Sequence, residues 1–171
     1  DRVRPADDLG RIGDTSKAPT VPEWDLAAFR DGVLGRHFSP DLVDTIFTSS
    51  GDVVSSAPEL ARLTLNIAAT HHDARVGRQG RLVYGGHTIG LALAQANRAL
   101  PNLATVLDWT SCDHTGPVHE GDPLTSELHV EGAQALATVG GVLELRSVVV
   151  AHEPDGTERP VLDWRFRALM A

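Results

Sequence analysis

The strongest candidates for catalytic residues lie in one segment, 60–94, which reads LARLTLNIAATHHDARVGRQGRLVYGGHTIGLALA. It contains His71 in a polar stretch, and Tyr84 followed by two glycines, Gly85 and Gly86, where a helical pattern begins. Imidazole can take up and release a proton near neutral pH, because its ordinary pKa is about 6.5. His71 could therefore act as an acid or base, or it could be a solvated histidine that caps a helix end.

Several histidines raise the question of a metal site. His71, His72 and Asp73 are adjacent, so they lack the i, i+4 spacing that places two ligands on one face of a helix. The other histidines considered are expected on separate elements: His87, His114 and His119. We therefore expect no metal ion.

The composition limits the classes of function. The chain has 171 residues, with 23 acidic against 15 basic side chains and a formal net charge of −8. This balance argues against general nucleic-acid binding, which needs a basic face. Cys112, the single cysteine, has no base beside it and is expected to be a small buried side chain. No apolar run of about 18 residues and no signal-peptide pattern occurs, so we expect no membrane span and a cytoplasmic location.

Two helices and a loop are expected to position the candidate residues. Ser56 and Glu59 form a capping-box pattern around a proline, which predicts a helix from residue 56 to about residue 69. Residues 70–83 are polar and contain two glycines, so we expect a loop there. A slim helix rich in Gly and Ala is expected over 86–100, and its small side chains suit a position that other elements wrap tightly.

Most of the remaining chain is expected to form strands. The expected strands are 42–48, 103–111, 124–131, 142–152 and 160–169. This order predicts an α+β fold in which an antiparallel sheet wraps around a long central helix. Residues 1–36 are expected to form an arm, with one short helix near residues 24–29, that packs on a domain formed by residues 37–171.

These segments resemble the MaoC-like family of hot-dog-fold (R)-specific enoyl-CoA hydratases and 3-hydroxyacyl-CoA dehydratases. That family carries a Gly-Asp-x-Asn-Pro-x-His element, and residues 65–71 here read LNIAATH. Asn66 falls on the family's catalytic Asp and His71 on its catalytic His. Tyr84-Gly85 falls on the pair that opens the family's central helix. The segment PVHEGDPL at residues 117–124 is similar to the family's Pro-Val-x-x-Gly-Asp-Thr-Leu strand entry.

The resemblance implies a hot-dog fold and the addition or removal of water across the α,β bond of an acyl-CoA thioester. It also implies that the CoA thioester is the substrate and that no cofactor is needed. His71 would be the acid and base, Asn66 would orient the water, and the amide of Gly85 would hold the thioester oxygen. Asn lacks the proton affinity of Asp but still donates and accepts hydrogen bonds, and members that resemble mesaconyl-CoA hydratase also carry Asn. Tyr84 and Gly86 would contact the substrate.

Other residues and other functions stay open. Arg75, Arg78 and Arg81 are spaced three apart and could bind the phosphates of CoA, or could simply be solvated. The alternatives are a non-catalytic subunit that binds acyl-CoA and a hot-dog thioesterase. Hot-dog thioesterases typically place a carboxylate on the central helix, which the expected helix 86–100 lacks.

Hot-dog domains of this family pair. We therefore expect a homodimer or a second hot-dog module. Because the only methionine is Met170, the N-terminus was processed or the sequence is a piece of a longer product, such as half of a double hot-dog protein.

Overall fold

The computed structural model describes residues 19–76 and 80–171. Its strands are β1 (Ile46–Thr48), β2 (Asp52–Val53), β3 (Leu103–Asp113), β4 (Pro123–Ala135), β5 (Gly141–His152) and β6 (Glu158–Met170). Its α-helices are α1 (Leu26–Gly32), α2 (Ala57–Leu63), α3 (Ala69–His72) and α4 (Gly85–Ala99). All strand pairs are antiparallel, in the order β1-β4-β5-β6-β3, and β2 also pairs with β4.

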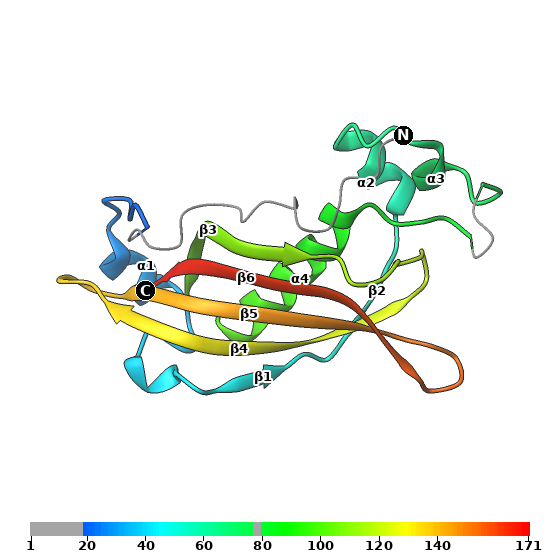
Figure 1. Cartoon of the computed structure of the whole chain (residues 1–171). Coiled ribbons are helices and arrows are strands. Elements are labelled where there is room, and N and C mark those ends of the chain that lie inside the picture. Colours follow the sequence, from blue (N-terminus) through cyan, green and yellow to red (C-terminus); the bar gives the residue numbers. More distant parts are fainter. Residues whose placement is uncertain (1–18, 77–79) are drawn as a thin grey trace.

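The long helix α4 lies against one face of this sheet (Figure 1) and contacts β4, β5 and β6. An antiparallel sheet that wraps around a long helix is the α+β arrangement expected from the sequence, and this prediction is confirmed. The strand expected over 42–48 is shortened to β1, because residues 40–42 form a 3₁₀ turn. The last four strands all extend beyond their expected bounds at one or both ends.

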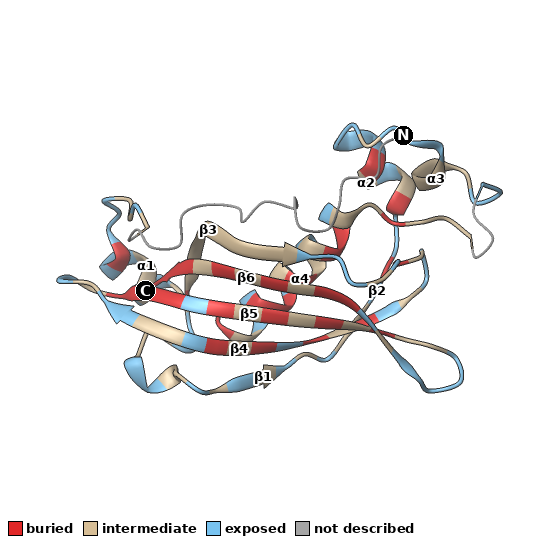
Figure 2. Ribbon diagram, in the orientation of Figure 1, coloured by how far each residue is buried: buried red, intermediate tan, exposed pale blue. Residues whose placement is uncertain are grey.

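The core lies between α4 and the inner face of the sheet. Buried residues recur along β5, along β6 up to its end, and along the first part of β4 (Figure 2). Trp164 is fully buried, and its ring stacks on Phe166 with centroids 3.9 Å apart and meets Trp109 edge-on at 5.4 Å. Ala92 and Ala96 are the buried apolar positions of α4, and their small size lets the helix lie close to these aromatic rings.

The helix expected from residue 56 to about 69 is wrong in its length and in its cap. It ends at Leu63, and Leu65 has a left-handed backbone with φ of 60°, so α3 is a separate turn. Ser56 is itself left-handed, with φ of 56°, and its side chain makes no capping hydrogen bond. The N–H of Ala57 instead donates to Oε1 of Glu120 at 3.2 Å, so a distant carboxylate caps α2.

Of the expected arm 1–36, residues 1–18 lie outside the described part of the chain. The expected short helix is α1, which Asp25 caps by accepting from two backbone N–H groups at 3.1 and 3.2 Å. Leu26 of α1 is buried in a small cluster with Val142 and Leu169. Its contacts place α1 at the end of the sheet where β6 ends (Figure 1).

Candidate active site

His71 lies on α3 and is held by the segment that leads to α4. Its ring Nδ1 lies 2.8 Å from the backbone oxygen of Leu82, and the N–H of Leu82 donates to the backbone oxygen of Thr70 at 3.1 Å. A carbonyl oxygen can only accept, so the neutral ring carries its hydrogen on Nδ1. Nε2 is then an unprotonated acceptor. His71 is thus in the tautomer that can take a proton through Nε2.

Asn66 lies in the turn between α2 and α3, where His72 rather than His71 reaches it. His72 Nε2 lies 3.0 Å from the backbone oxygen of Asn66. The side-chain amide of Asn66 donates to Oγ1 and to the backbone oxygen of Thr64, at 2.9 and 3.3 Å. Within the described residues, no hydrogen bond joins Asn66 to His71. With its N–H groups occupied, the Asn66 side chain has its oxygen left as the atom that could accept from a water.

Two rings lie over the glycines that begin α4. A β-carbon at Gly86 would lie 2.4 Å from Cε2 of Tyr84, and one at Gly85 would lie 2.5 Å from Nε2 of His114. Only glycine fits at these positions while the rings stay in place. The Tyr84 ring also meets the His71 ring edge-on, with centroids 6.3 Å apart. The first N–H groups of a helix have no partner within it, so this end of α4 can hold an anionic oxygen.

His87, in the first turn of α4, belongs to the same end of the helix. Its ring centroid lies 6.4 Å from that of Tyr84, its Nδ1 is buried without a hydrogen-bond partner, and burial lowers its pKa below the ordinary value. Sequence reasoning weighed His87 only as a metal ligand. The spacing did hold a signal, because His87 is eight residues before Gln95 on the same helical face, and both are buried.

The three candidate arginines have different environments. Arg81 forms an ion pair with Glu120 and donates from Nε to the backbone oxygen of His72 at 3.2 Å. The Arg75 side chain is 90% exposed and pairs with Asp73 at 2.8 Å. Arg78 lies outside the described residues. Arg81 therefore ties together elements of the fold, whereas Arg75 is accessible from solvent.

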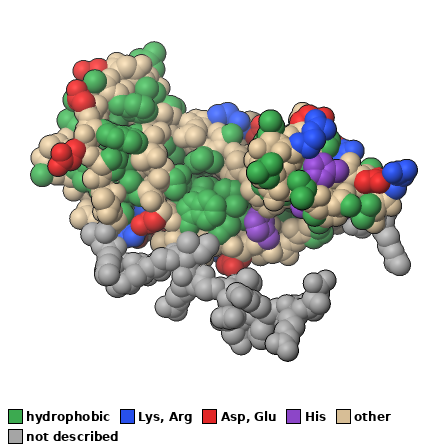
Figure 3. Space-filling view, turned by 90° about the horizontal axis from the view of Figure 1, so that it is seen from above, with side chains coloured by type: hydrophobic (Ala, Val, Ile, Leu, Met, Phe, Trp, Pro, Cys, Tyr) green, Lys and Arg blue, Asp and Glu red, His purple; other side chains and the backbone are tan. Residues whose placement is uncertain are grey.

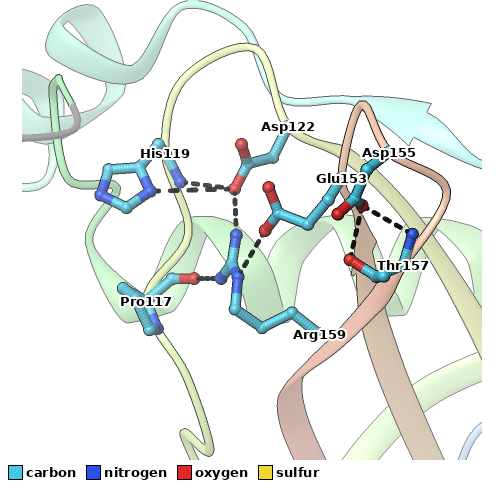
Figure 4. Close-up of polar contacts among 7 residues, drawn as sticks. All are labelled: Pro117, His119, Asp122, Glu153, Asp155, Thr157 and Arg159. Carbon is cyan, nitrogen blue, oxygen red and sulfur yellow. Dashed lines mark hydrogen bonds and ion pairs between the residues drawn. The ribbon is translucent and has the colours of Figure 1, made fainter.

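An arginine network holds the connection between β3 and β4 (Figure 4). Arg159 of β6 donates to the backbone oxygen of Pro117, to Asp122 Oδ2 at 3.1 Å and to Glu153 Oε1 at 2.7 Å. Asp122 Oδ2 also accepts from the backbone N–H of His119 at 2.9 Å. Asp122 is therefore a point at which Arg159 of β6 holds this connection in place. In the same view, the β5–β6 turn is closed separately by Asp155, which accepts from Thr157.

The β3–β4 connection, which Arg159 holds in place, in turn positions the segment before α4. The N–H of Val83 donates to the backbone oxygen of Val118 at 2.8 Å, and Leu82 pairs with His119 as an isolated β-bridge. Because the carbonyl of Leu82 fixes the ring of His71, the network determines where that ring lies. This link joins residues far apart in the chain, and no motif or spacing in the sequence indicates it.

Cys112 is half-buried and packs against the core, less deeply than expected. Burial, together with the nearby Asp113 carboxylate, raises the pKa of its thiol. A protonated thiol is a poor nucleophile.

An open apolar groove runs between α4 and the edge strand β3. It has a volume of about 350 Å³ and is lined by Leu93 and Asn97 of α4 and by Leu103 and Val106 of β3, among others. Figure 3 shows hydrophobic side chains gathered on this upper face, with histidines toward the half that holds α2 and α3. Among the described strands, β3 pairs only with β6, so its other edge is open.

In the described part of the chain, no cluster of three or more His, Cys, Asp or Glu side chains has a geometry suited to a metal ion. None of the helices there combines the length and hydropathy needed to cross a bilayer.

Comparison with known proteins connects this geometry to a class of enzymes. No model of a protein family matches the chain. A β-methylmalyl-CoA dehydratase from Chloroflexus aurantiacus is 32% identical over 129 residues, which are 66% of this chain and 37% of the relative. A mesaconyl-CoA hydratase from Cereibacter sphaeroides is 35% identical over 99 residues, 57% of this chain and 28% of the relative.

Solved structures agree with these sequence matches. A conserved hypothetical protein from Mycobacterium tuberculosis, described as having a double hotdog fold, is 62% identical with a TM-score of 0.82 and matches 96% of this chain and 51% of its own. A MaoC domain protein from Chloroflexus aurantiacus is 26% identical with a TM-score of 0.70, over 89% of this chain and 50% of its own. The chain is thus a hot-dog unit related to the MaoC-like hydratases and dehydratases. It spans about a third of the curated relatives and about half of these solved chains.

Proposed function

We propose that this hot-dog unit adds water to, or removes it from, the α,β bond of an acyl-CoA thioester. The observation that carries the proposal is the His71 ring, which lies beside the start of α4 and whose Nδ1 is bound to the Leu82 carbonyl, while Nε2 makes no hydrogen bond to another described residue. The curated relatives named a CoA dehydratase and a CoA hydratase support this reaction class.

In the hydration direction, Nε2 of His71 removes a proton from water while the water oxygen bonds to the β-carbon. The π electrons of the double bond move toward the thioester, whose oxygen gains negative charge. The amide of Gly85 holds that oxygen, because a helix N-terminus carries unpaired N–H groups and partial positive charge. His71 then returns its proton to the α-carbon. Water is the only co-reactant, so the step balances without a cofactor.

We assign supporting roles to the remaining candidate residues. The free side-chain oxygen of Asn66 accepts a hydrogen bond from the water. Tyr84 and Gly86 form the wall beside the thioester, because the ring of Tyr84 lies over Gly86. Arg75, exposed on the surface, contacts a phosphate of CoA. Arg78 is a second candidate for this contact, whereas the charge of Arg81 is already balanced by Glu120. We also propose a cytoplasmic location, because acyl-CoA thioesters are available inside cells.

We further infer that a second hot-dog unit covers the groove between α4 and β3, either as a second copy of the chain or as another module. The open edge of β3 and the half-exposed apolar residues beside it support this pairing. Replacing Val106 with Glu would place a charge in the groove. Sedimentation of the purified protein should then show a smaller species or the loss of the partner, and an unchanged assembly would contradict the pairing.

The reaction is tested with crotonyl-CoA and with a branched or dicarboxylic C4–C5 enoyl-CoA, following enone absorbance and free thiol together. Loss of enone absorbance without thiol release is the expected result. Thiol release would indicate a thioesterase. Binding without either change would indicate the non-catalytic subunit, an alternative that the Asn66 hydrogen bonds to Thr64 favour because they occupy the amide.

A further inference from the structure

His114 is a second imidazole at the start of α4. A β-carbon on Gly85 would lie 2.5 Å from its Nε2 and 2.7 Å from its Cε1, distances that real β-carbons do not reach. The ring therefore rests directly on the helix residue whose amide is proposed to hold the thioester oxygen. A β-carbon in a helix is tilted toward the helix N-terminus. Nε2 of His114 therefore lies on the side of Gly85 where the unpaired amides begin.

The backbone on both sides fixes the place of this ring. His114 directly follows β3, and the N–H of Thr115 donates to the backbone oxygen of Val161 at 3.1 Å. A β-carbon on Gly116 would lie 2.5 Å from the backbone oxygen of Pro160, so the chain passes close against β6. The ring is thus carried by main chain anchored to the sheet, which is the kind of support that a positioned functional group needs.

The chemistry of His114 differs from that of His71. No hydrogen bond to another described residue occupies either of its ring nitrogens. His114 is an exposed residue, yet the atoms packed around its ring lower the pKa of His114, and the Asp113 carboxylate opposes this shift. A neutral imidazole offers one N–H donor. Such a donor can polarise a carbonyl without giving up its proton.

We propose that His114 is a further catalytic residue, which donates from Nε2 to the thioester oxygen beside the Gly85 amide. This inference rests on the function proposed above. The two imidazoles then have different roles. His71 transfers the protons, and His114 together with the Gly85 amide stabilises the negative charge that develops on the thioester oxygen. Two converging donors stabilise such charge more than a single amide does.

The first test replaces the side chain and measures kcat and KM on whichever enoyl-CoA the wild-type protein hydrates. His114→Leu should lower kcat by about 100-fold with little change in KM, because loss of one oxyanion donor typically costs 10²–10³ in kcat. His114→Gln keeps an N–H donor and should lose about tenfold or less. His129→Leu, at an imidazole on β4 that pairs with Glu127, is the matched control and should behave as wild type.

The second test is a double-mutant cycle with Gly85→Ala. The added methyl group must displace the His114 ring, so Gly85→Ala should be strongly impaired in the wild-type background. In the His114→Ala background the same change should cost only a few-fold, because the ring is already absent. Strictly multiplicative losses would show that the contact does not matter for catalysis and would overturn the inference.

The outcomes separate the two proposals. If the wild-type protein hydrates enoyl-CoA and His114→Leu does so equally well, the role of His114 is wrong while the reaction stands. If the wild-type protein hydrates none of the substrates, the proposed function fails and the role of His114 fails with it. Thermal unfolding of each variant shows whether a loss of kcat reflects a loss of folded protein.

Discussion

The proposed base can be tested against its own neighbour, because His71 and His72 are nearly matched in structure. Each lies on α3, and each ring makes one hydrogen bond to a backbone oxygen, at 2.8 Å to Leu82 and at 3.0 Å to Asn66. They differ in which nitrogen is used. His71 binds through Nδ1 and leaves Nε2 free, whereas His72 binds through Nε2.

The expected magnitudes follow from this pairing. His71→Ala and His72→Ala each remove one hydrogen bond at a half-buried site, which costs about 1 kcal/mol of unfolding free energy. The two variants should therefore be similarly stable. Loss of a general base lowers the rate by about 10²–10⁴, equivalent to about 3–5 kcal/mol of transition-state stabilisation. His71→Ala should lose about 1000-fold in kcat/KM, whereas His72→Ala should stay within about tenfold of wild type.

The assay is enone loss under steady-state conditions, with chemical denaturation of each variant as the measure of stability. Free imidazole added to His71→Ala should restore part of the rate, because it can enter the space that the ring leaves and take the proton. Equal losses in the two variants would mean that α3 matters only as structure. Wild-type activity in His71→Ala would refute the assignment of the base.

Three further predictions follow from other contacts. Asn66→Ala should lower kcat by about tenfold without a matching rise in KM, measured in the same assay, because the water loses one orienting acceptor. Arg159→Met should lower the free energy of unfolding by about 2 kcal/mol in urea denaturation, because Asp122 is left partly buried without its cation. Burial depresses the folded-state pKa of His87 below its unfolded value of about 6.5, so the unfolded state binds the proton more readily and stability should fall as the pH drops below about 6.5. A denaturation series from pH 8 to 5 should show a shallower decline in His87→Leu, and an equal slope in both proteins would contradict the reasoning.

The sheet and its central helix could be predicted because their signals are local. Alternation in β4 places Leu124, Ser126, Leu128 and Val130 on one face, and all four are buried. The region after α2 could not be predicted in the same way. The apolar residues there follow a helical pattern and favour a continuous helix. The backbone of Leu65, however, is in the left-handed conformation, and its side chain is 80% exposed. Apolar composition predicts burial only where another element is available to cover the residue.

For the candidate site, motif spacing brought together residues that are close in sequence. His71 and Tyr84 are placed on neighbouring segments, and their rings are in edge-on contact. The contact between His114 and Gly85 joins residues 29 positions apart, and the contacts of Arg159 reach further still. Such pairs depend on how the β3–β4 connection folds back over the start of α4. Neither periodicity nor turn propensity specifies that path.

The candidate active site and the open apolar groove lie at different ends of α4. The candidate chemistry gathers at Gly85, whereas the open groove lies beside Leu93 and Asn97. At 1.5 Å per helical residue, the groove begins about 12 Å along the helix from the glycine. A partner that covers the groove would therefore bury the first part of the open edge of β3, at the other end of that strand from His114. Within one unit, Arg159 and the Leu82 carbonyl already hold the His71 ring, so pairing is expected to stabilise the fold and close the groove rather than to create the base.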